Sequence, residues 1–133
     1  MLIIKKILKI FKLPIAILLL HIFLVPLGIY EKYLWFDIPM HLLGGLSVAM
    51  SYLALLKLMQ SKKRLQMPEQ ILFVFVVSLV ALTGILWEFS EFILDILTTS
   101  IKAQQGLTDT MSDLFFNLIG GVFGYFLKNH KSL

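Results

Sequence analysis

Leu107–Gly124 reads LTDTMSDLFFNLIGGVFG, and its pattern decides the fold class of the whole chain. Drawn as a helix, the stretch gathers its polar and small residues on one face, because they recur at spacings of three and four. These residues are Asp109, Asp113, Asn117, Gly120 and Gly124. The opposite flank is apolar. Polar groups on such a helix are costly inside a bilayer and are usually kept where a site needs them, so this face predicts one wall of a polar site.

The composition of the 133-residue chain is that of a membrane protein. Hydrophobic residues make up 59% of it and the mean hydropathy is +0.89, which is unlike a soluble domain. The absence of cysteine excludes disulfides, thiolate metal sites and cysteine nucleophiles. The net charge of +4 comes mainly from short connections between apolar runs, so no nucleic acid partner is expected.

Four apolar runs predict four membrane spans, at about residues 13–29, 38–56, 71–89 and 110–127. Residues 1–12 form a basic amphipathic lead-in to the first of them. A signal peptide is the competing interpretation of this start, but no small-x-small cleavage site follows, so we expect an uncleaved helix. The expected fold is all-α, a polytopic membrane protein with one domain over residues 1–133 built as a four-transmembrane-helix bundle.

The charges of the connections predict the orientation of these spans. Ten of the twelve Lys and Arg residues lie in the N-terminal segment, in residues 57–64 and in the C-terminal tail, leaving Lys32 and Lys102 on the other side. By the positive-inside rule, both termini are then cytoplasmic, in a bacterial cytoplasmic membrane. Seven of the eight acidic residues lie at the outer ends of the spans, since only Glu69 is on the basic side.

Polar residues at helical spacing mark three of those outer ends. Asp37 and His41 open the second span, Glu88 and Glu91 end the third, and the 107–124 face opens the fourth. Small residues on the same faces would let the helices approach closely: Gly44, Gly84, Gly120 and Gly124. The candidate metal ligands are therefore Asp37, His41, Glu88, Glu91, Asp109 and Asp113. Asn117, Asp95 and His21 are expected to support them, although His21 more often indicates an interhelical hydrogen bond.

Carboxylates that converge in this way need compensation. Two like charges about 4 Å apart repel by about 4 kcal/mol at an effective dielectric constant near 20. A bound divalent metal ion would remove this cost. The oxygen-rich set with one imidazole favours Mg²⁺, Mn²⁺ or Ca²⁺, and His41 also admits Zn²⁺ or Fe²⁺; the expected cofactor is Mg²⁺, Mn²⁺ or Zn²⁺. A hydrogen-bonded network that joins helix ends and a proton relay are the alternatives. Asp37 and Asp109 could also cap their helices.

Three blocks of sequence resemble the YjdF-like small bacterial membrane proteins and, more distantly, VanZ-like proteins. They are FDIPMHLLGG at 36–45, WEFSEF at 87–92 and LTDTMSDLFFNLIGG at 107–121. The resemblance implies a pattern of Asp before His, Glu-x-x-Glu, and Asp-Thr-x-x-Asp leading into glycines. It implies no settled biochemical activity, although VanZ-like proteins are associated with glycopeptide resistance at the cell envelope.

Two functional hypotheses of different classes follow from these residues. The first is a metal-dependent hydrolase or transferase that acts on an envelope lipid, at a lipid-linked phosphate or ester near the outer leaflet. Its partners would be membrane lipid and a lipid-linked substrate. The second is a non-catalytic accessory or interaction protein whose polar cluster joins helix ends, with homo-oligomers expected for so small a scaffold. Ion or proton transport is a weaker third, because His21 is its one deeper ionisable group.

Overall fold

The structure of the chain is a computed structural model that describes residues 2–97 and 103–130. The described residues are almost all helical and contain no strand. The long helices are α1 (Leu2–Ile10), α2 (Lys12–Leu24), α4 (Asp37–Ser61), α5 (Glu69–Leu97) and α6 (Leu107–His130). Short turns join α2 to α4, namely η1 (Val25–Leu27), α3 (Ile29–Lys32) and η2 (Leu34–Phe36). The expected all-α polytopic membrane fold is confirmed.

Three segments are long and apolar enough to cross a membrane. They are Leu34–Ser61, Glu69–Leu97 and Leu107–Lys128. A fourth span exists if α1 and α2 count as one, since Ile4–Ile10 and Lys12–Leu27 are bent by 68° relative to each other. The basic lead-in is therefore a separate helix, α1, and the expected first span corresponds to α2 with η1. The chain is a multi-pass membrane protein.

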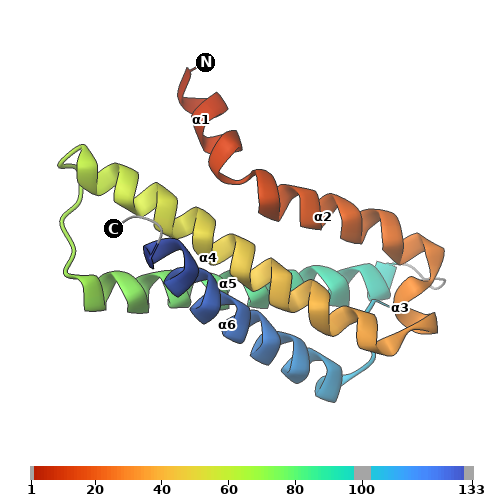
Figure 1. Cartoon of the computed structure of the whole chain (residues 1–133). Helices are drawn as coiled ribbons and strands as arrows, with labels where there is room; N and C mark the ends of the chain where they lie inside the picture. The colour runs from red at the N-terminus through yellow and green to blue at the C-terminus, as the bar shows by residue number, and fades with distance from the viewer. Residues whose placement is uncertain (1, 98–102, 131–133) are drawn as a thin grey trace.

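Helices α4, α5 and α6 pack together, and α2 lies beside the first half of α4 (Figure 1). The closest packing joins α4 to α6, because glycines allow the two backbones to meet. A Cβ on Gly120 would overlap the carbonyl group of Leu42, and one on Gly124 would overlap that of Leu46. The glycines of the 107–124 face therefore pack within the chain.

The sequence-based choice of Gly44 as a packing glycine is wrong. Apart from its own helix backbone, nothing lies within 4 Å of the place where a Cβ of Gly44 would be. Its neighbour Gly45 makes the close contact instead, with the backbone of Asn117. Adjacent helical residues point about 100° apart, so only one glycine of the pair can face α6.

The apolar core lies in the half of the bundle toward the α4–α5 connection. It consists of buried residues from α4, α5 and α6: Ala49, Leu53, Leu56, Leu72, Val76, Val80 and Tyr125. The buried polar side chains gather at the opposite end, where α4 and α6 begin and α5 approaches its end. The bundle thus separates an apolar half from a polar one, and the polar half holds the candidate site.

Candidate functional site

Three helices bring four carboxylates and a histidine to one place. Asp37 and His41 lie one turn apart at the start of α4, because residues at i and i+4 share a helix face. Glu88 and Glu91 lie on one face of α5, and Asp113 lies in the second turn of α6. All five residues are buried, with 7% or less of their surface exposed. The structure therefore joins five of the six expected ligands into one cluster.

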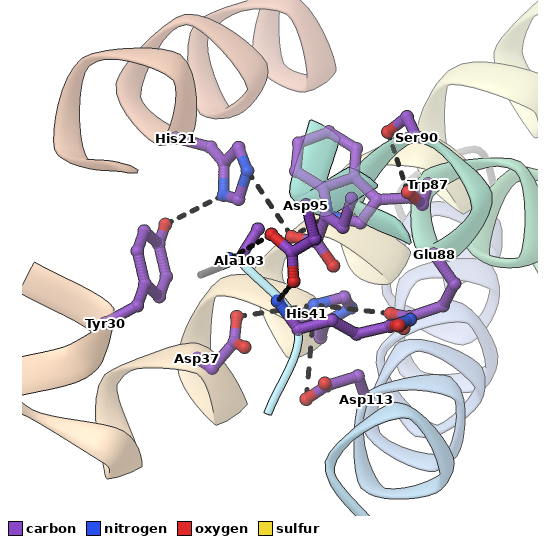
Figure 2. A network of polar contacts seen from close by, with 12 residues as sticks. His21, Tyr30, Asp37, His41, Trp87, Glu88, Ser90, Asp95, Ala103 and Asp113 are labelled. Carbon is purple, nitrogen blue, oxygen red and sulfur yellow. Dashed lines mark hydrogen bonds and ion pairs between the residues drawn. The ribbon is translucent and has the colours of Figure 1, made fainter. Parts of the chain in front are cut away.

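His41 is the centre of this cluster. Its Nε2 atom lies 3.3 Å from Oδ1 of Asp37, 3.8 Å from Oε1 of Glu88 and 4.0 Å from Oδ1 of Asp113 (Figure 2). Each of these oxygens comes from a different helix. An imidazole nitrogen carries at most one hydrogen, so His41 cannot satisfy three carboxylates at once through this atom.

The spacing of these atoms is the spacing of metal ligands. Asp37, His41 and Asp113 offer ligand atoms that all lie within 4.8 Å of one another, and so do His41, Glu88 and Glu91. Two atoms bound to one ion at about 2.0–2.6 Å lie at most about 4–5 Å apart. Each set therefore has the spacing needed to hold one ion, and the two sets share His41.

Two oxygens of the cluster lack hydrogen bonds. Among the described residues, neither Oδ1 of Asp37 nor Oε1 of Glu88 has a hydrogen-bond partner, although both atoms are buried. Leaving a charged acceptor buried and unsatisfied costs roughly 1–3 kcal/mol or more. Both oxygens face Nε2 of His41, at distances where a small cation would fit between the ligands.

A second layer of polar contacts holds Glu91 in position. Nε2 of His21 lies 3.4 Å from Oε1 of Glu91, and the indole N–H of Trp87 donates a 2.9 Å hydrogen bond to the same oxygen. On the other side of the ring, Nδ1 of His21 lies 2.9 Å from the hydroxyl of Tyr30 (Figure 2). Burial raises the pKa of Tyr30 above its ordinary range, so the hydroxyl keeps its proton. The phenol can then donate to Nδ1 while Nε2–H points at the carboxylate.

The segment after α5 folds back over the cluster. Asp95 accepts hydrogen bonds from the backbone N–H groups of Ala103 and Gln104, at 2.7 and 3.0 Å. The side-chain amide of Gln104 then donates to Oε2 of Glu88 at 3.2 Å. Asp95 therefore contacts the cluster indirectly, by holding the backbone that carries Gln104.

Asp109 and Asn117 lie outside the two ligand groups. Oδ2 of Asp109 accepts the backbone N–H of Gln105 at 3.0 Å, so this carboxylate caps the start of α6. Because α6 begins at Leu107, Asp109 stays half-buried in the first turn while Asp113 reaches the interior. The amide of Asn117 donates to the carbonyl of Val80 at 3.1 Å and joins α6 to α5.

Sequence reasoning missed three partners of the cluster. Tyr30 and Trp87 were not among the expected site residues, yet their polar atoms bind His21 and Glu91. Gln104 lies in the connection before α6, where no helical spacing relates it to the cluster. The spacing of four between Trp87 and Glu91 was the one signal available for any of these contacts.

Comparison with known proteins places the chain in a family. The family described as "Predicted membrane protein (DUF2238)" matches residues 4–130. An uncharacterized protein of Thermotoga maritima is 32% identical over 96 residues, which are 71% of this chain and 47% of that protein. The chain thus spans about half the length of this relative. No solved structure matches. The YjdF-like resemblance agrees with this family, whereas a VanZ-like relationship finds no support.

Proposed function

We propose, from the premise that this chain belongs to the DUF2238 family of predicted membrane proteins, that it binds a divalent metal ion at the outer end of its helical bundle. The observation that carries the proposal is the arrangement around Nε2 of His41. Three carboxylate oxygens from three helices surround this atom, and two of them accept no hydrogen bond from the described residues.

A metal ion explains the cluster better than a hydrogen-bonded network does. A network that joins helix ends needs a donor for each buried acceptor, and among the described residues Oδ1 of Asp37 and Oε1 of Glu88 have none. Within the described residues, the cationic partners within 4.0 Å of these carboxylates are histidines. Carboxylate oxygens with one shared imidazole favour Mg²⁺, Mn²⁺ or Zn²⁺.

The chemistry that follows is hydrolysis or group transfer at an envelope lipid. A divalent ion supplies Lewis-acid activation of water and of a phosphoryl or carbonyl oxygen. In hydrolysis, the water oxygen would bond to phosphorus or to the carbonyl carbon, the lipid alcohol would leave, and a proton from the water would pass to it. Asp37, His41, Glu88, Glu91 and Asp113 would hold the ion, and the Glu91 carboxylate could pass the proton of the water to the leaving alcohol.

The site belongs on the outer side of a bacterial cytoplasmic membrane. The basic residues of the α4–α5 connection are at the opposite end of the bundle from the cluster, which supports cytoplasmic termini and an outward-facing site. A cluster at this depth lies near the lipid head groups, where phosphate and ester linkages are found.

Metal content is the test of this proposal. We would purify the protein in mild detergent, incubate it with Mg²⁺, Mn²⁺ or Zn²⁺, remove the unbound ion and measure bound metal by elemental mass spectrometry. Near-stoichiometric metal is expected in the wild type, with a loss of about tenfold or more in affinity for His41→Ala and Asp113→Asn. Asp109→Asn is the matched control, because it neutralises a nearby carboxylate that lies outside the cluster.

Two outcomes would overturn the proposal. One is a wild type that binds none of the three ions and gains no thermal stability from them, because the cluster would then join helix ends only. The other is an equal loss of metal in Asp109→Asn and Asp113→Asn, since binding would then depend on the general negative charge. Activity assays on lipid phosphates and esters become informative once the ion is established.

A further inference from the structure

A cavity of about 220 Å³ lies between α2 and the pair formed by α4 and α5. It begins at the level of His21, His41 and Trp87, beside the carboxylate cluster. From there it follows α4 from Met40 to Val48, a distance of roughly 12 Å at 1.5 Å per residue. Nearly all of this length lies within segments apolar enough to span a membrane, so the surroundings of the cavity are lipid.

The walls of the cavity are almost entirely apolar. Pro14, Ile15, Ile17 and Leu18 line it from α2. The polar groups among its other neighbours are used inside the protein. The hydroxyl of Thr83 donates to the carbonyl of Leu79 at 2.8 Å, and the indole N–H of Trp87 is taken by Glu91. A polar occupant would therefore find few partners along the walls, whereas hydrocarbon would fit.

The cavity is open toward the bilayer, and Gly44 leaves room in one of its walls. Ile15 and Leu18 keep 37% and 40% of their surface exposed although they line it, so a chain from the surrounding lipid can enter beside α2. Gly44 lines it as well, at a place where nothing would meet a Cβ. An apolar cavity of about 150 Å³ accepts a benzene-sized molecule, so about 220 Å³ has room for a longer stretch of hydrocarbon.

We propose that this cavity holds one acyl chain of a membrane lipid, with the polar linkage of that lipid at His21 and His41 beside the carboxylate cluster. The identification of the lipid as the substrate rests on the proposed metal-dependent function, whereas binding of the chain does not. The arrangement selects a molecule with one inserted hydrocarbon chain and a polar group at its end. A water-soluble phosphate or ester would leave the apolar cavity empty.

Tryptophan fluorescence tests chain binding directly. The chain has two tryptophans, and Trp35→Phe leaves Trp87, at the polar end of the cavity, as the single reporter. The protein would be reconstituted into phosphatidylcholine vesicles containing increasing fractions of lipid with brominated acyl chains, in the presence of EDTA. Bromine quenches a tryptophan that it contacts, so strong quenching of Trp87 is expected.

Variants at adjacent positions separate the cavity from the outer surface. Gly44→Leu adds a side chain to the cavity wall, at a position where the new Cβ meets no other group. It is expected to lower the relative affinity for the brominated chain by about tenfold or more, the scale of one or two excluded methylene groups. Leu43→Phe adds bulk next to it on an exposed position that does not line the cavity, and is expected to leave quenching unchanged. Ile15→Phe narrows the cavity from α2 and replaces Gly44→Leu if that variant does not fold by circular dichroism.

Quenching that is unchanged in a folded Gly44→Leu or Ile15→Phe protein overturns the acyl-chain proposal, and so does the absence of quenching in the Trp35→Phe protein. Metal binding is measured on the same samples after removal of EDTA, so the two proposals fail separately. If metal binds but quenching does not depend on the cavity, only the acyl-chain proposal is rejected. If quenching depends on the cavity but no metal binds, the acyl-chain proposal is supported and the metal-dependent function is rejected.

Discussion

Nε2 of His41 lies 3.3 Å from Oδ1 of Asp37, one helical turn earlier on α4, and yet this carboxylate oxygen has no hydrogen bond within the described part of the chain. The pair is built by local sequence alone, since residues four apart meet on one helix face. The tertiary fold then adds Glu88 and Asp113 on the same side of the ring. More carboxylates converge on His41 than one imidazole can satisfy, so a change in any of them is expected to alter stability or metal binding.

Asp37→Asn is expected to change the melting temperature in opposite directions with and without metal. In EDTA the amide removes one of several buried, mutually repelling charges, so the variant is expected to melt higher than the wild type by the equivalent of about 1–2 kcal/mol. With a divalent ion at about 100 times its dissociation constant, the wild type gains about 2.7 kcal/mol, and the variant loses most of that gain. Thermal melts in detergent measure both effects, and an equal shift in both conditions would contradict the metal site.

Tyr30→Phe is expected to weaken metal binding although Tyr30 touches no candidate ligand directly. Removing the hydroxyl leaves Nδ1 of His21 without its partner and frees the ring that faces Glu91. Loss of such an outer partner typically costs 10–100-fold in metal affinity. A metal titration followed by thermal stability measures this, with Tyr33→Phe as control because Tyr33 is exposed. Equal affinity of Tyr30→Phe and wild type would show that His21 does not position Glu91.

Tyr30→Phe is also expected to change how the melting temperature depends on pH above about pH 9. The pKa of Tyr30 is raised above its ordinary value by burial, so its hydroxyl stabilises the fold fully below about pH 10. Above that pH the unfolded chain loses this proton first, and the free energy of unfolding falls by up to about 1.4 kcal/mol per pH unit. Melting temperatures from pH 9 to 11 are therefore expected to fall more steeply for wild type than for Tyr30→Phe, and parallel curves would contradict the buried phenol.

Much of this architecture could be predicted from the sequence, because hydropathy marks the helices and helical spacing marks their polar faces. The spacing of four between Asp37 and His41, and of three between Glu88 and Glu91, was enough to place each pair on one helix face. The contact between His21 and Glu91 could not be predicted, since it depends on the position of α2 along the axis of α5. The capping role of Asp109 depends on where α6 begins, and helix boundaries are the least certain part of a sequence pattern.

Cysteine labelling is expected to place the two ends of the bundle on opposite sides of the membrane. The chain contains no cysteine, so a single introduced thiol gives an unambiguous signal. Thr108→Cys lies at the start of α6 beside the cluster, and Gln66→Cys lies in the basic α4–α5 connection; both positions are exposed. A thiol reagent that does not cross membranes is expected to label Thr108→Cys in intact cells and Gln66→Cys only after lysis. The reverse labelling pattern would mean that the site faces the cytoplasm.

Gly44 and Gly45 are expected to respond in opposite ways to the same methyl group. Gly45→Ala places a Cβ against the backbone of Asn117, which cannot move aside as a flexible side chain could, so α4 and α6 must separate. We expect a loss of at least about 1–3 kcal/mol. Gly44→Ala meets only open space and removes a flexible helix residue, so a gain of about 0.5–1 kcal/mol is expected.

Thermal or denaturant unfolding in mild detergent measures this pair, with far-UV circular dichroism to confirm that both variants remain helical. The comparison is internally matched, because the two substitutions are chemically identical and adjacent on one helix. Equal effects at both positions would mean that α4 is rotated about its axis from the orientation described. The rotation would also move His41 out of the cluster, since His41 lies one turn before Gly45 on the same face.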